Sequence, residues 1–151
     1  RDQDLSRIDM GAYLRELALN LRSAYGFTES GVGFNFAIEP VLILFDYAIP
    51  CGLVVNELLT NSFKHAFPGK RAGGLISIDL SVSEGSTLLI GYRDNGIGYG
   101  NAGAEPPADS IGMRIIRGIV EHQLAGAVEF SGEDGFSCTI TFRMTGYRER
   151  V

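Results

Sequence analysis

Basic residues are scarce in this sequence, and so are the patterns that build membrane spans. Lys and Arg number 13 against 18 Asp and Glu, which gives a formal net charge of −5 and a pI near 5.0. A general nucleic-acid-binding protein needs a basic surface to neutralise phosphates, so this composition argues against that class. No apolar run approaches the roughly 20 residues that a spanning helix needs, and we recognise no secretory signal. We therefore expect a cytoplasmic domain that makes no membrane contact.

Cysteine is equally sparse. Cys51 and Cys138 stand in apolar surroundings and lack the spacing of metal ligands. This placement favours two buried, reduced thiols over a disulfide.

The remaining composition is that of one globular domain. The chain has 151 residues, of which 45% are hydrophobic and 21% charged. Hydrophobic periodicity predicts helices over residues 9–25, from Pro50 to about 66, and over 110–125, with Asp9 as a cap of the first. Alternation predicts strands over 34–38, 76–82, 88–92, 127–131 and 136–144, whereas 41–45 is ambiguous. This order predicts a two-layer α/β sandwich in which helices cover one face of a mixed sheet.

The third predicted helix should pack on the sheet through an apolar side. The residues expected on that side are Ile111, Ile115, Ile116, Ile119 and Val120.

The most informative run is Asn56–Pro68. On a helix, Glu57, Asn61 and Lys64 follow i, i+4, i+7 spacing and point within roughly 60° of one another. The Asn61 carboxamide suits Mg²⁺ that is also held by phosphates, because this ion prefers oxygen ligands. The lysine can neutralise phosphate charge, and the glutamate can orient or deprotonate a nucleophile. The helix therefore predicts a nucleotide site.

A second informative segment, residues 94–100, lies where a predicted strand ends. The Asp94 carboxylate can accept a hydrogen bond from an exocyclic amine such as adenine N6. The glycines that follow let the backbone approach a flat base. Taken alone, the same Asp-Asn-Gly run is also typical of a tight turn.

The third segment is Ser110–Met113, which opens a helix after a Gly-, Ala- and Pro-rich loop at 98–109 that we expect to be mobile. Helix N-termini bind phosphates through free N–H groups. An ordinary Ser cap followed by a packing glycine is the alternative interpretation.

Together these segments resemble the ATP-binding domain shared by DNA gyrase, ATP-dependent chaperones, mismatch-repair ATPases and sensor histidine kinases, which is a Bergerat-type (GHKL) fold. The most specific resemblance is to the second histidine-kinase subfamily (HisKA_2 type), near the HWE kinases. The residues that carry it are 13–17, 48–53, 56–68, 94–98 and 110–113.

The resemblance implies a Mg-ATP site. It implies that Asn61 coordinates the Mg²⁺, that Asp94 receives adenine N6, and that residues 99–110 form an ATP lid. The implied catalytic residues are Glu57 and Lys64. The implied nucleotide-binding residues are Asn61, Lys64, His65, Asp94, Gly96, Gly98, Gly100, Ser110 and Gly112.

The resemblance also implies a function and a domain organisation. Residues 9–147 would be a histidine kinase catalytic domain that transfers the ATP γ-phosphoryl group to a histidine on a separate helical dimerisation domain. Residues 1–8 would be the tail of that domain and 148–151 a C-terminal tail, with a response regulator acting downstream. The alternatives are an ATPase of the chaperone or gyrase kind, in which Glu57 activates water, and a nucleotide-binding regulatory module.

Three features depart from the family pattern. The helical hairpin that carries the phosphoacceptor histidine is missing, and with no Trp in the chain the Trp-x-Glu signature of the HWE group is missing too. The family's Gly-Thr before the last strand appears here as Gly135-Phe136, and Ser137 is the candidate to replace the threonine.

Overall fold

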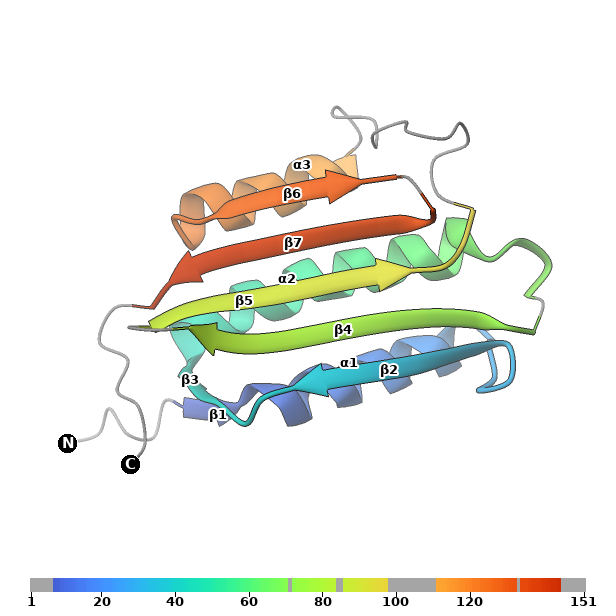
Figure 1. Ribbon diagram of the computed structural model, residues 1–151, viewed down its shortest axis with the longest axis horizontal. Helices are drawn as coiled ribbons and strands as arrows, with labels where there is room; N and C mark the ends of the chain where they lie inside the picture. Colours follow the sequence, from blue (N-terminus) through green and yellow to red (C-terminus); the bar gives the residue numbers. More distant parts are fainter. Residues whose placement is uncertain (1–6, 71, 84–85, 98–110, 133, 145–151) are drawn as a thin grey trace.

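The fold is built on a five-stranded mixed sheet with helices on a single face (Figure 1). The computed structural model describes residues 7–70, 72–83, 86–97, 111–132 and 134–144. Strands β2, β4, β5, β7 and β6 form the sheet in that order; β2 and β4 are parallel, and the other neighbours are antiparallel. Behind them lie α1, α2 and α3. The predicted two-layer α/β sandwich is confirmed.

The element bounds follow the predicted order closely. The elements are β1 (Arg7–Asp9), α1 (Met10–Ala24), β2 (Val32–Ile38), β3 (Leu42–Leu44), α2 (Phe45–Asn61), β4 (Gly74–Ser83), β5 (Thr87–Asp94), α3 (Ile111–Gly118), β6 (Ala127–Ser131) and β7 (Phe136–Arg143). A π-helical turn continues α2 over Ser62–Ala66, and another continues α3 over Ile119–Gln123. A short 3-10 segment covers Pro68–Lys70.

Alternation explains the central strands. Ile76, Ile78 and Leu80 of β4 are fully buried, while the residues between them point to the other face of the sheet. β5 follows the same rule and pairs with β4 through a hairpin, and β6 and β7 form a second hairpin. Both predicted hairpins are confirmed.

Helix α1 begins and ends as its sequence predicts. The Asp9 carboxylate accepts a hydrogen bond from the Ala12 N–H at 3.1 Å, which caps the first turn. Leu14 and Ala18 are fully buried on its inner side. Gly26, with a φ of 80°, adopts the left-handed conformation that ends the helix.

The ambiguous segment, residues 41–45, contains strand β3 and the first residue of α2. β3 pairs antiparallel with β1, so that Arg7 lies opposite Leu44. Arg7 and Ile8, expected in the tail of a preceding helix, are thus in a strand.

The predicted start of α2 is wrong, because the helix begins at Phe45, five residues before Pro50. Proline at 50 leaves the Asp46 carbonyl without its helical N–H donor. Cys51, Val54 and Val55, all buried, nevertheless hold this part of the helix against the sheet.

Helix α3 packs through a different arc from the one predicted. Ile116 and Val120 are fully buried, as expected, and Met113 is buried with them. The prediction that Ile111 and Ile115 face the sheet is wrong, because these residues are 76% and 42% exposed. Positions 113, 116 and 120 follow one helical face, and 111 and 115 share a different one.

Both cysteines are free and buried, which confirms the predicted thiols. Burial raises the pKa of Cys51 and of Cys138 to about 12, although the charge of Arg117 opposes the shift at Cys138. Within the part of the chain that the structure describes, no helix is long and apolar enough to cross a membrane.

Candidate functional site

The first part of the site lies where α3 begins beside α2. Glu57 and Asn61 are half-buried, one turn apart on α2. A Cβ added to Gly112 would lie 3.1 Å from Glu57 Oε2 and 3.3 Å from Asn61 Nδ2. The structure thus brings Gly112 against two side chains that lie more than 50 residues earlier in the sequence, and a side chain at position 112 would press on both of them.

Replacing Gly112 with alanine should separate binding from stability. Its methyl group would press on Asn61 and Glu57, so we expect Mg-ATP affinity to fall about tenfold. Stability should not fall, because alanine favours a helix over glycine by about 1 kcal/mol. Nucleotide titration and thermal unfolding measure the two effects.

Gly118 in the same helix is the matched control, because a Cβ there meets nothing within 4 Å. Gly118→Ala should leave nucleotide affinity unchanged. Equal affinity in Gly112→Ala and the unmodified chain would contradict a role for this contact.

The second part of the site is the buried Asp94 carboxylate at the end of β5, which is 2% exposed. Its Oδ1 accepts hydrogen bonds from the N–H groups of Gly96 at 3.0 Å and Phe136 at 3.3 Å. The Ser62 hydroxyl donates to Oδ2 at 2.6 Å. Burial raises the pKa of Asp94, and these three hydrogen bonds oppose the shift by stabilising the charged form.

The backbone after Asp94 lies directly against the end of α2. The Ile97 N–H donates to the Ala66 carbonyl oxygen at 3.1 Å. A Cβ on Gly96 would collide with that same oxygen. Gly96 is therefore required for close approach to α2, whereas the sequence suggested close approach to a base.

Lys64 and His65 lie in the π-helical turn after Asn61, and both are exposed. The α-helix ends at Asn61, so the shared face of Glu57, Asn61 and Lys64 stays a prediction at Lys64. Residues of a π-turn advance less around the axis than α-helical ones, which changes the direction of Lys64. Such turns are frequent at functional sites.

Ser137 does not replace the family's threonine. Asp94 pairs with Phe136 in the sheet, and Arg93 pairs with Ser137. Because successive residues point to opposite faces, Ser137 lies on the face away from Asp94.

Sequence reasoning missed Ser62 and Tyr92. The Ser62 hydroxyl lies 2.7 Å from the Tyr92 hydroxyl, which also donates to the Leu58 carbonyl at 3.2 Å. The available signal was a serine on the otherwise apolar side of α2, since a buried hydroxyl requires a partner.

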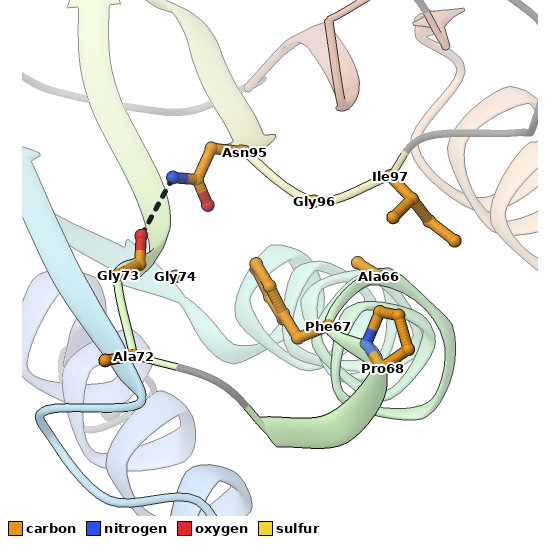
Figure 2. Close-up of a pocket in the computed structure, with 9 residues that line it drawn as sticks. All are labelled: Ala66, Phe67, Pro68, Ala72, Gly73, Gly74, Asn95, Gly96 and Ile97. Carbon is orange, nitrogen blue, oxygen red and sulfur yellow. Dashed lines mark hydrogen bonds between the residues drawn. The ribbon is translucent and has the colours of Figure 1, made fainter.

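A shallow hollow of about 250 Å³ lies beside this site, between the end of α2 and the start of β4 (Figure 2). The Asn95 side chain closes one edge by donating to the Gly73 carbonyl at 3.1 Å and accepting from the Leu75 N–H at 2.7 Å. Among the residues that the structure describes, nine line the hollow and none of these carries a charge: Ala66, Phe67, Pro68, Ala72, Gly73, Gly74, Asn95, Gly96 and Ile97.

Several predicted residues lie outside the described part of the chain. These are Gly98, Gly100 and Ser110, together with the lid expected over 99–110.

The donor set limits how a metal could bind. In the described ranges, no three His, Cys, Asp or Glu side chains gather as a metal site. A Mg²⁺ ion there would need oxygen ligands from a bound phosphate besides Asn61. This fits Mg²⁺, which is usually held by few protein ligands together with substrate phosphates.

Residues 47–146 match the family model described as histidine kinase-, DNA gyrase B-, and HSP90-like ATPase. The chain belongs to this family. The match covers α2, the Asp94 segment and α3, so the part of the fold that carries the candidate site is the part that defines the ATPase family.

Individual members of this ATPase family show the same relationship. The chain is 32% identical over 114 residues to blue-light-activated histidine kinase 2 of Erythrobacter litoralis, which is 76% of this chain and 32% of that protein. It is 30% identical over 83 residues to sensor histidine kinase PdtaS of Mycobacterium tuberculosis, covering 55% of this chain and 16% of that protein. The chain thus spans about a third or less of these relatives.

Solved structures agree on the fold. The histidine kinase domain of the Erythrobacter litoralis EL346 blue-light activated histidine kinase superposes with a TM-score of 0.74 at 27% identity, covering 91% of this chain and 62% of that one. The mycobacterial sensor histidine kinase MprB gives 0.65 at 18% identity, which supports the fold alone.

Proposed function

We propose that this chain is the Mg-ATP-binding catalytic domain of a sensor histidine kinase. It would transfer the γ-phosphoryl group of ATP to a histidine on a separate dimerisation domain. The observation that carries the proposal is the Asp94 carboxylate at the end of β5, which is buried and held by three donors. One of these donors is Ser62, the residue directly after Asn61. The relatives that match this chain are named histidine kinases, which favours a kinase over other members of the ATPase family.

We assign the roles as follows. Asn61 supplies an oxygen ligand to Mg²⁺, which when bound would neutralise charge on the phosphates. Asp94 accepts a hydrogen bond from the adenine amino group, and the first turn of α3 at Gly112 leaves room for phosphate. Glu57 orients the acceptor imidazole, and Lys64 and His65 supply positive charge or hydrogen bonds to phosphate.

The wider assignments belong to the same proposal. The catalytic domain would comprise the described fold, bounded near residues 9 and 147. Its partners would be the phosphoacceptor helical domain and a response regulator. A cytoplasmic location agrees with the use of ATP and with two free buried thiols.

Asp94→Asn tests the adenine assignment. An amide has a single acceptor oxygen, so its NH2 group would face a donor in the protein or the adenine amino group. We expect affinity for an ATP analogue with Mg²⁺ to fall about 10- to 100-fold, because a hydrogen bond to a charged group is worth about 1.5–3 kcal/mol. Calorimetric titration with ATP and GTP analogues measures this, and equal affinity of the unmodified chain for both would count against the adenine role.

The transfer reaction is tested with γ-labelled ATP, the chain alone, and the chain mixed with a histidine kinase dimerisation domain. We expect acid-labile label on the added domain and none on the chain. Steady phosphate release that Glu57→Gln abolishes without loss of binding would instead favour the ATPase alternative.

A further inference from the structure

A buried polar chain links the Asp94 carboxylate to the backbone of α2. It runs from Asp94 Oδ2 to the Ser62 hydroxyl, 2.6 Å away, and from there to the Tyr92 hydroxyl at 2.7 Å. The Tyr92 hydroxyl also reaches the Leu58 carbonyl at 3.2 Å. Ser62, Tyr92 and Asp94 are each at most 2% exposed, so water does not take part freely in these contacts.

The protons in this chain have a preferred order. Ser62 has a single hydroxyl proton, and the charged Asp94 oxygen is its strongest acceptor. Tyr92 also has a single hydroxyl proton, which it then shares between the Ser62 oxygen and the Leu58 carbonyl oxygen in a three-centre hydrogen bond. Its hydroxyl thereby ties β5 to the last turn of α2, directly before the π-helical turn.

The same contacts determine which part of Asp94 remains available to a ligand. A carboxylate has about four acceptor sites. Among the described residues, two backbone N–H groups bind Oδ1 and Ser62 binds Oδ2, which leaves one site that no described residue fills. The Gly96 N–H belongs to the loop after β5 and the Phe136 N–H to β7, whereas the Ser62 hydroxyl is a side-chain donor from the π-helical turn that continues α2.

We propose that Ser62 and Tyr92 are positioning residues for base recognition: Ser62 directs the remaining acceptor site of Asp94, and Tyr92 holds the Ser62 hydroxyl. This inference rests on the proposed adenine role of Asp94. It adds that the preference for adenine is set from inside the core, by a hydroxyl pair that does not touch the nucleotide.

The test compares Ser62→Ala and Tyr92→Phe by titration with Mg²⁺ and ATP or GTP analogues. The readout is the ratio of the two dissociation constants, which a general loss of stability leaves unchanged. We expect the preference for ATP to fall about fivefold in Ser62→Ala and less in Tyr92→Phe, as the loss of about 1 kcal/mol would give.

Two controls complete the design. Tyr13→Phe removes a tyrosine hydroxyl that faces Gly52 in the contact between α1 and α2, and it should leave the ratio unchanged. In an Asp94→Asn background, Ser62→Ala should cause no further fall, because the group that it directs is gone.

The outcomes are distinguishable. If the unmodified chain shows no preference for ATP, the adenine role of Asp94 fails and the inference fails with it. If that preference is present and both variants retain it, with altered unfolding temperature or without, the inference alone is overturned.

Discussion

Asn61→Ala should reduce Mg²⁺-dependent ATP affinity and phosphoryl transfer by on the order of 100-fold or more, the largest effect that we expect at this site. Alanine removes the carboxamide oxygen that would be a Mg²⁺ ligand, and no cluster of three His, Cys, Asp or Glu side chains in the described chain offers another metal site. Asn61 is half-buried at the end of α2, and alanine is a better helix former. The fold should therefore survive.

Titration with and without Mg²⁺ separates the metal effect from general binding. Loss of affinity in Asn61→Ala should appear mainly when Mg²⁺ is present. Asn20→Ala makes the same chemical change at an exposed position of α1, and it should leave the ATP affinity unchanged both with and without Mg²⁺. If Asn61→Ala retained Mg²⁺-dependent affinity and transfer, the metal assignment would be wrong.

Gly96→Ala should be strongly destabilising, although it adds only a single methyl group. Its Cβ would collide with the Ala66 carbonyl oxygen and lie 2.8 Å from the carbonyl carbon, so the backbone itself must move. Moving it strains the Ile97-to-Ala66 hydrogen bond and the Gly96 N–H bond to Asp94. We expect a loss of about 2–4 kcal/mol in the free energy of unfolding, together with loss of nucleotide binding.

Chemical denaturation measures this loss. Gly33→Ala in β2 is the matched control, because a Cβ there meets only backbone oxygens at 3.9 and 4.0 Å, an ordinary contact distance. If Gly96→Ala lowered the free energy of unfolding by less than about 0.5 kcal/mol, the loop after β5 could accept the methyl group, and the predicted clash with Ala66 would be wrong.

The sequence predicted most of the fold because alternation and helical periodicity are local properties. Strand β4 and helix α1 follow from their own residues. The start of α2 was predicted wrongly, because Pro50 is a strong local signal for the first turn of a helix. The burial of Cys51 and Val54, which holds the helix together around the proline, depends on the whole sheet. The prediction for Ile111 and Ile115 failed for a related reason. Periodicity identifies apolar positions on a helix, but the packing against the sheet determines which of them are buried.

The site divides in the same way. Glu57 and Asn61 are neighbours on one helix turn, so their spacing suffices to predict that they lie together. Gly112 lies beside them because α3 contacts α2. The order of motifs in the family implies this contact, but no local sequence pattern predicts it. The Ser62-to-Asp94 hydrogen bond joins residues 32 positions apart, and no local pattern in either segment predicts it.

The small sheet of β1 and β3 connects the start of the described chain to α2. β1 is paired residue for residue with the strand that ends at Leu44, and α2 begins at the next residue. Phe45 and Glu57 are twelve residues apart, about 18 Å at about 1.5 Å per residue. A force applied to the chain at β1 would therefore act on the first residue of the helix that carries Glu57 and Asn61.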